Sequence, residues 1–283
     1  MLRMVRDYFE VLKPRESSLL TFVGVCAAII AGAGHPPLGL LLLTLLAILL
    51  ASAGANGLTN YLDRHIDARM QRTRNRALPS KRIKPPEKVL PLTIGLAVIG
   101  LALAWLLHPL CFIADAVGTT AALVWRKKAT CVFPQGVIAS CAPVLMGWFA
   151  ISPHFSWQLV LLCLLIAAWL PLHVWSVMIA NREEYLEAGL SYFPMSREVK
   201  QAIKVLLIFS LVLYATSITL YFIGSYAWLY LVLANVLGII MVYASWQLLA
   251  SSTSHKAWRL YKLSAFPYLG LIFLTMCLDI WLF

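Results

Sequence analysis

The sequence predicts an all-α, polytopic membrane protein with about nine transmembrane helices around a central cavity. Of its 283 residues, 61% are hydrophobic and only 12% are charged, whereas soluble domains are about half apolar and a quarter charged. Long stretches such as 40–53 and 205–254 carry no charged residue. Apolar runs of about 18 residues or more are typical of membrane spans. A lipid bilayer is therefore the first partner that we expect.

Apolar runs separated by charged, proline or glycine breaks define the expected spans in order. They cover residues 18–34, 38–57, 89–107, 110–125, 135–152, 157–179, 203–222, 227–248 and 264–282. The fourth run is short. Residues 1–14 mix acids with bases and predict an amphipathic lead-in rather than a cleavable signal peptide. Since no internal repeat or low-complexity segment divides the chain, we expect residues 1–283 to form a single domain.

The basic residues indicate an orientation. All 23 Lys and Arg precede the first span or lie in, or at the edge of, alternate loops. The other loops, 34–38, 107–110, 152–157 and 222–227, contain none. Positive residues are enriched on the cytoplasmic side, so we expect a cytoplasmic N-terminus and a C-terminus outside a bacterial or archaeal cell membrane. The same placement argues against nucleic acid as a partner, despite the net charge of +11.

A cluster of ionisable residues, "NYLDRHIDARMQRTRNRALPS" (60–80), follows the second apolar run. Asn60, Asp63 and Asp67 share one face if the helix continues past the membrane, and Gln71 continues that face. Two carboxylates and an amide oxygen suit Mg²⁺, which typically combines one or two carboxylates with substrate phosphates. Cations that would neutralise phosphate charge are Arg64, Arg69, Arg72, Arg74, Arg76, Lys81 and Arg82. A solvated loop with salt bridges and a helix cap is the alternative.

A second acidic cluster follows the sixth span, in "WLPLHVWSVMIANREEYLEAGLSYFPM" (169–195). Whichever face of a helix turns inward, two of Glu183, Glu184 and Glu187 can share it, with Arg182 beside them. His173 lies inside the span, where an ionisable side chain favours a functional role. A buried, hydrogen-bonded structural histidine is the alternative. The two acidic clusters together predict a polar chamber above an apolar cavity, suited to a ligand with a diphosphate head and a hydrocarbon tail.

These motifs resemble those of the UbiA superfamily of intramembrane prenyltransferases, and within it the branch that modifies haem. "LKPR" (12–15) is similar to the N-terminal signature, and residues 60–80 to the N-x-x-D-x-x-x-D motif with its arginine-rich extension. "WLPLHVWSVMI" is similar to W-x-P-P-H-F-W, and "REEYLEAG" to R-x-E-D-Y-x-x-A-G. "WRKKAT", "APVLMGW" and "YKLSAFPYLGLIFL" also have counterparts. The resemblance therefore extends over essentially the full length.

The resemblance implies transfer of a farnesyl group from farnesyl diphosphate to a vinyl group of protohaem IX, assisted by Mg²⁺. The product would be haem O, a possible substrate for a downstream haem A synthase. The expected catalytic residues are Asn60, Asp63, Asp67 and Glu184. The expected metal ligands are Asp63, Asp67, Glu183, Glu184 and Glu187. The expected substrate-binding residues are Arg64, Arg72, Arg74, Arg76, Lys81, Lys127, Lys128, His173, Arg182 and Tyr185.

In this interpretation, the expectation that haem is the acceptor depends on His173. Imidazole is a common protein ligand of haem iron, so we expect His173 to line the haem pocket and to ligate or orient the iron. Trp169 and Trp175 flank it and could face a flat macrocycle. One alternative is a UbiA-type enzyme acting on a quinone precursor, a chlorin or a lipid. Another is an anionic-lipid transporter, which predicts translocation without chemistry and leaves the paired acidic clusters unexplained.

Overall fold

The computed structural model describes residues 2–124 and 128–283, and within them every regular element is a helix. The longer helices are α1 (Leu2–Val11), α2 (Pro14–Ala31), α3 (Leu38–Asp67), α4 (Leu90–Leu107), α5 (Pro109–Leu123), α6 (Phe133–Ile151), α7 (Trp157–Ala180), α9 (Val199–Ile223), α10 (Trp228–Ser251), α11 (Ser254–Leu263) and α12 (Leu271–Leu282). Shorter elements are η1 (Pro86–Val89), η2 (Ala129–Cys131), α8 (Arg182–Glu187) and η3 (Ser264–Gly270).

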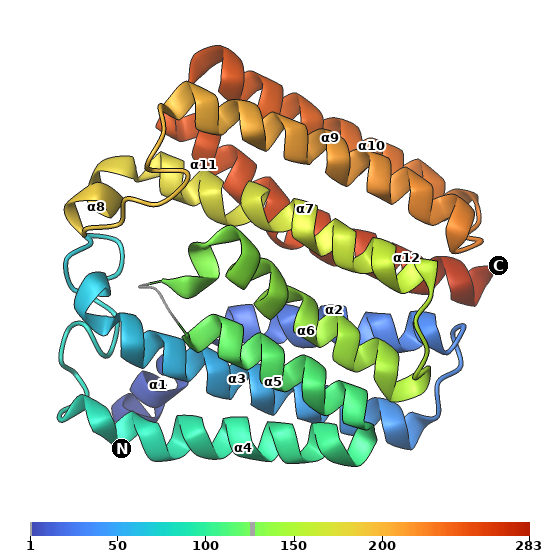
Figure 1. Cartoon of the computed structure of the whole chain (residues 1–283), viewed down its shortest axis with the longest axis horizontal. Coiled ribbons are helices and arrows are strands. Elements are labelled where there is room, and N and C mark those ends of the chain that lie inside the picture. Colours follow the sequence, from blue (N-terminus) through green and yellow to red (C-terminus); the bar gives the residue numbers. More distant parts are fainter. Residues whose placement is uncertain (1, 125–127) are drawn as a thin grey trace.

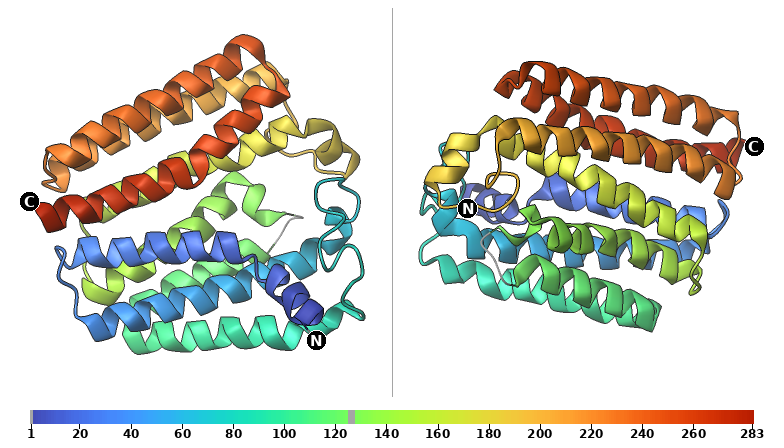
Figure 2. Two further views of the ribbon diagram at one scale, coloured as in Figure 1. Left: turned by 180° about the vertical axis from the view of Figure 1, so that it is seen from behind. Right: turned by 45° about the horizontal axis from the view of Figure 1, so that its top comes forward.

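The long helices run side by side along one direction, and the two chain termini lie at opposite ends of the bundle (Figures 1 and 2). One end carries α1, α8 and the long segments 68–85 and 188–198, and we call it the loop-rich end. The opposite end carries the short turns 32–37, 152–156 and 224–227. The basic segments identified in the sequence therefore gather at the loop-rich end.

The expected membrane passes are present as helices. Within the described residues, eight helical stretches are long and apolar enough to cross a bilayer. The fourth expected pass corresponds to α5, which has only 15 residues and is therefore about 22 Å long, less than the roughly 30 Å of a typical hydrocarbon core. The chain is thus an integral membrane protein, with eight long helices and, at the fourth expected pass, the short apolar helix α5.

Two helices continue beyond the limits predicted from hydropathy. Helix α3 runs to Asp67 rather than ending near residue 57, and helix α11 begins at Ser254, before the span expected from residue 264. Hydropathy marks where the membrane ends, whereas backbone hydrogen bonding continues into the polar region. The side chain of Thr253 caps α11 by accepting a hydrogen bond from the Lys256 N–H. The longer α3 carries the first acidic motif on helical backbone.

Glycines let the helices around the central cavity approach closely. A Cβ atom added to Gly147 of α6 would overlap the carbonyl oxygen of Gly24 in α2, and one added to Gly54 of α3 would overlap the backbone of Ala97 in α4. Small residues at such crossings are how membrane helices gain packing contacts without a hydrophobic driving force between them. This packing fixes α3 and α6, both of which border the candidate site.

Candidate active site

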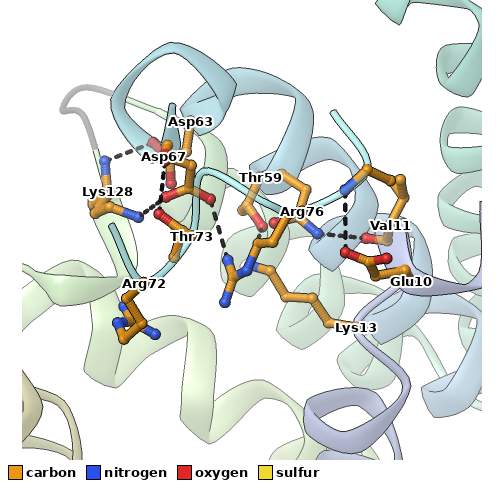
Figure 3. Close-up of polar contacts among 12 residues, drawn as sticks. Glu10, Val11, Lys13, Thr59, Asp63, Asp67, Arg72, Thr73, Arg76 and Lys128 are labelled. Carbon is orange, nitrogen blue, oxygen red and sulfur yellow. Dashed lines mark hydrogen bonds and ion pairs between the residues drawn. The ribbon is translucent and has the colours of Figure 1, made fainter. Parts of the chain in front are cut away.

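The two aspartates of the first motif lie one turn apart at the end of α3, facing the loop-rich end (Figure 3). Asp67 is 2% exposed, and its Oδ1 accepts a hydrogen bond from Lys128 Nζ at 2.6 Å while its Oδ2 accepts one from Arg76 Nη1 at 3.1 Å. The Oδ1 of Asp63 accepts the backbone N–H of Lys128 at 2.9 Å. The expected continuation of the helix is thus confirmed, and the segment after residue 127 is held against the motif.

Lys128 is buried and remains the cation of a tight ion pair. Burial disfavours its ammonium, but the neighbouring Asp67 carboxylate outweighs this cost and raises the pKa of Lys128 above its usual value. Lys128 therefore keeps its charge at neutral pH. The other lysine expected here, Lys127, lies outside the described residues.

Lys13 is a cation of this site that was not singled out in the sequence, although it belongs to the "LKPR" motif. Its Nζ donates a hydrogen bond to Thr59 Oγ1 at 3.2 Å. Burial, and then the positive charges of Arg76 and Lys128, lower the pKa of Lys13. No carboxylate of the described residues forms an ion pair with it. An anion bound beside Lys13 would therefore relieve repulsion among three cations.

Asn60 connects α3 to the N-terminal segment. Its side-chain Nδ2 donates to the carbonyl oxygen of Val11 at 2.7 Å, and the residue is buried. The amide nitrogen is thus occupied by a backbone contact that fixes the segment carrying Lys13. Gln71 does not continue the face of Asn60 and Asp67 as expected, because α3 ends at Asp67 and Gln71 lies exposed in the following turn.

Three other cations of the first motif lie away from the two aspartates. Arg64 covers the ring of Tyr61 at 4.0 Å and donates to the Tyr61 carbonyl oxygen at 2.6 Å. Arg74 and Lys81 are exposed on the 68–85 segment. The structure therefore brings Arg76 to the aspartates, but it does not bring Arg64, Arg74 or Lys81 into contact with them.

Arg82, also counted among the phosphate-neutralising cations, has a structural contact instead. Its guanidinium pairs with Asp7 and, at 2.6 Å, with Glu10 Oε2. The other oxygen of Glu10 accepts the backbone N–H of Ala77 at 3.1 Å. These contacts fasten α1 to the 68–85 segment, so the acids of the N-terminal segment are partners of Arg82.

The second acidic motif turns mainly outward. Tyr185 in α8 and Ala188 directly after it are buried, whereas Glu183 and Glu187 are exposed. Glu184 is half-buried, and its Oε2 is buried without a hydrogen-bond partner among the described residues. The sequence predicted two carboxylates on the inward face of this helix, but Tyr185 occupies that face of α8.

The expected metal ligands are therefore not assembled as a set. Within residues 2–124 and 128–283, no three His, Cys, Asp or Glu side chains are grouped closely enough to hold a metal ion. Asp63 and Asp67 are neighbours on α3, and Glu184 is the inward carboxylate of α8. The donor set of α3 alone, two carboxylates one turn apart, still fits Mg²⁺, which completes its shell with phosphate and water oxygens.

Contact between the two motifs runs through Tyr185 rather than through a glutamate. Arg72 Nη2 donates to the Tyr185 hydroxyl at 3.2 Å, and burial raises the pKa of Tyr185, so the phenol stays neutral. Arg182 donates instead to the carbonyl oxygens of Met195 and Arg197, at 2.9 and 3.1 Å. Arg182 thus stabilises the segment after α8 through these backbone hydrogen bonds.

Two cavities meet at Lys13 and Arg76. One, of about 470 Å³, lies against α1 and residues 76–79 at the loop-rich end. The other, of about 260 Å³, enters the bundle between α2, α3, α5, α6 and α7. Small side chains line much of the second cavity: Ala51, Ser52, Ala55, Gly118, Ala122, Ala139, Ser140 and Ala142. A ligand with an anionic head at the cations and a hydrocarbon tail fits this arrangement.

His173 lines the inner cavity, and its ring is held in one orientation. The imidazole stacks between Trp169 and Tyr261, with centroid separations of 4.9 and 4.6 Å. Ser264 Oγ lies 3.2 Å from His173 Nδ1 and donates its own proton to the Tyr261 carbonyl oxygen. With the Ser264 hydroxyl donating there, we infer that Nδ1 carries the ring proton and donates a hydrogen bond to Ser264 Oγ, which leaves the lone pair of Nε2 for a ligand. Trp175 packs in a separate aromatic group with Phe133, Phe193 and Phe209 and does not face the cavity as expected.

Asp115 of α5 also lines the inner cavity and was not singled out in the sequence. The signal was present, since an acid within an expected span at 110–125 favours a functional role by itself.

Comparisons with known proteins give a consistent picture. A model of the UbiA prenyltransferase family matches residues 18–270. A protoheme IX farnesyltransferase of Desulforudis audaxviator (strain MP104C) is 37% identical over 98% of this chain and 89% of its own length. One of Symbiobacterium thermophilum is 35% identical over 98% of this chain and 95% of its own.

Solved structures share the fold. A digeranylgeranylglyceryl phosphate synthase structure in membranes matches with a TM-score of 0.79, 18% identity and coverage of 98% of both chains. A UbiA homolog from Archaeoglobus fulgidus bound to DMAPP and Mg²⁺ matches with a TM-score of 0.70, 14% identity and coverage of 98% of this chain and 100% of that chain. The predicted all-helical, UbiA-like architecture is confirmed.

Proposed function

The chain belongs to the UbiA prenyltransferase family, and we propose that it transfers a farnesyl group from farnesyl diphosphate to a vinyl group of protohaem IX, giving haem O. The observation that carries this proposal is that Arg76, which pairs with Asp67, also lines the inner cavity together with Lys13 and His173. We propose that the aspartates and their cations form the head of one site, that the inner cavity holds the hydrocarbon tail, and that His173 in the cavity wall contacts the acceptor. Relatives named protoheme IX farnesyltransferase cover almost the whole chain, which supports this acceptor.

The diphosphate belongs at the head of the site. Lys13, Arg76 and Lys128 supply positive charge there, and preorganised cations stabilise a leaving group as negative charge develops on it. Mg²⁺, when bound to Asp63 and Asp67, would supply further charge neutralisation for the departing diphosphate. Glu184, whose Oε2 has no hydrogen-bond partner within residues 2–124 and 128–283, is the further carboxylate that we propose faces this head.

The inner cavity shields the reaction from water. Loss of diphosphate leaves an allylic cation on the farnesyl group, which bulk water would capture. The cavity lies between helices of the bundle, and we propose that the bound substrates fill it and exclude bulk water. We propose that His173 holds the acceptor at the far side of this cavity, so that the vinyl carbon meets the cation.

Product analysis of the purified protein in lipid nanodiscs tests the proposal. Incubation with protohaem IX, farnesyl diphosphate and Mg²⁺ should give a haem whose mass has increased by one farnesyl group and one hydroxyl group. A prenylated quinone precursor, chlorin or glycerolipid in place of prenylated haem would identify a different acceptor. Movement of farnesyl diphosphate across the bilayer without any product would instead favour a transporter. Such a haem O product could pass through the membrane to a haem A synthase.

We also propose that the loop-rich end is cytoplasmic, as in a bacterial or archaeal cell membrane. The argument is the concentration of Lys and Arg at this end and their absence from loops 34–38, 107–110, 152–157 and 222–227. Single cysteines replacing Arg74 and Ser225, both exposed, should react with membrane-impermeant maleimide from opposite sides in a background lacking the native cysteines. Arg74→Cys should be labelled only from the cytoplasmic side. Labelling of both from the same side would contradict the orientation.

A further inference from the structure

Asp115 is a buried acid in an apolar helix with an unused oxygen. It is 5% exposed, and its Oδ1 accepts a hydrogen bond from Thr119 Oγ1 at 3.3 Å. Its Oδ2 is buried with no hydrogen-bond partner among residues 2–124 and 128–283. No Lys or Arg of those residues forms an ion pair with it. Burying an ionisable group without a partner is costly, so a purely structural role leaves this arrangement unexplained.

Asp115 and His173 lie in the wall of the same cavity. Both residues line the inner cavity, and α6 packs against both α5 and α7, which carry them. A ligand held by His173 in this cavity therefore comes within reach of Asp115.

The other acids near the cavity are committed elsewhere. Asp67 is paired with Lys128 and Arg76, and Asp63 accepts a backbone N–H at the head of the site. Glu16 borders the same cavity but is exposed at its mouth beside Lys13. Asp115 is thus the cavity-lining carboxylate that is free to take up a proton deep in the bundle.

We propose that Asp115 is a catalytic general base for the water that completes the acceptor side chain, a role that rests on the function proposed above. The C–O bond to diphosphate breaks, and the vinyl π electrons form a new C–C bond to farnesyl C1. The positive charge then lies on the vinyl carbon attached to the pyrrole ring. Water adds its oxygen to that carbon and gives one proton to the Asp115 carboxylate, leaving a hydroxyl group. The proton is released to solvent after turnover, so atoms and charge balance.

Removal of this base should change which product forms. In Asp115→Asn, the side chain keeps its size but cannot accept the proton, and positioned general bases contribute about 10²- to 10⁴-fold. The cation should instead lose a proton from the adjacent methylene carbon to the released diphosphate, giving an alkenyl haem lighter by one water. We expect the ratio of alkenyl to hydroxylated haem, measured by mass spectrometry after a single turnover, to rise at least about tenfold.

The ratio of alkenyl to hydroxylated haem distinguishes a general-base role of Asp115 from an effect on folding or on the overall rate. If Asp115→Asn only reduced the amount of folded protein, the total product would fall, but the ratio of alkenyl to hydroxylated haem would stay that of the wild type. Asp115→Glu restores a carboxylate and should bring the ratio back toward that of the wild type. An unchanged ratio in Asp115→Asn, whether the rate falls or not, would overturn the base role and leave only electrostatic or structural effects. Complete loss of both products would also overturn it, because the base acts after the C–C bond has formed. If the wild type forms no prenylated haem, it is the proposed function that fails.

Discussion

Asp67→Asn should reduce farnesyl transfer by about a thousand-fold or more, the largest effect that we expect from a single substitution. Asp67 places both carboxylate oxygens on cations, Lys128 at 2.6 Å and Arg76 at 3.1 Å. The asparagine cannot hold Mg²⁺ as a carboxylate does, and it leaves two cations without their counter-charge. Initial rates at saturating farnesyl diphosphate and Mg²⁺ measure the loss.

Two comparisons show why activity falls in Asp67→Asn. Glu87→Gln removes an exposed acid elsewhere at the loop-rich end, beyond Tyr61, and should retain activity. Among the described residues Asp63 accepts the backbone N–H of Lys128 and forms no ion pair, so Asp63→Asn leaves the ion pairs of Asp67 with Lys128 and Arg76 in place. If both aspartates bind Mg²⁺, the two variants should fall together, and wild-type activity should vanish in EDTA and return with Mg²⁺. A severe loss confined to Asp67→Asn would restrict its role to placing Lys128 and Arg76. Wild-type activity in Asp67→Asn would contradict both roles.

Much of the fold follows from local properties that a sequence displays. Apolar runs predict the membrane helices because every backbone polar group must be satisfied within the bilayer. The alternation of basic and uncharged loops predicts which helix ends lie together, and these ends do gather at the loop-rich end. Hydropathy does not predict where helices stop in water, which is why α3 and α11 extend past their expected limits. The fourth apolar run is short in the sequence, and its helix α5 has only 15 residues.

The site was predictable where spacing along one helix decides geometry, as for Asp63 and Asp67. It was not predictable where tertiary packing chooses a face. The spacing of Glu183, Glu184 and Glu187 does not reveal that Tyr185 takes the inward position of α8. Contacts between distant segments were likewise hidden. Arg82 lies in the same arginine-rich segment as the cations expected to bind phosphate, but its partners, Asp7 and Glu10, lie in α1.

The second large effect is expected at His173, and it should be confined to the acceptor. Trp169 and Tyr261 stack on the imidazole, and Ser264 Oγ lies 3.2 Å from its Nδ1, so we infer that the lone pair of Nε2 is the group that ligates or orients haem iron. His173→Ala removes this nitrogen. We expect haem affinity to fall at least about tenfold, the equivalent of roughly 1.4 kcal/mol, with a shift of the Soret band. Titration of the purified protein with protohaem IX, followed by absorbance, measures both.

Binding of the other substrate identifies what His173 does. The affinity for farnesyl diphosphate should stay near that of the wild type in His173→Ala, because Lys13, Arg76 and Lys128 lie at the head of the site and remain in place. His255→Ala removes an exposed imidazole from α11 and should leave the affinity for haem and the Soret band unchanged. Added imidazole should return the His173→Ala spectrum toward that of the wild type if the nitrogen is an iron ligand. Unchanged haem binding together with weakened diphosphate binding would instead assign His173 to the donor half of the site, and haem would then need a different anchor.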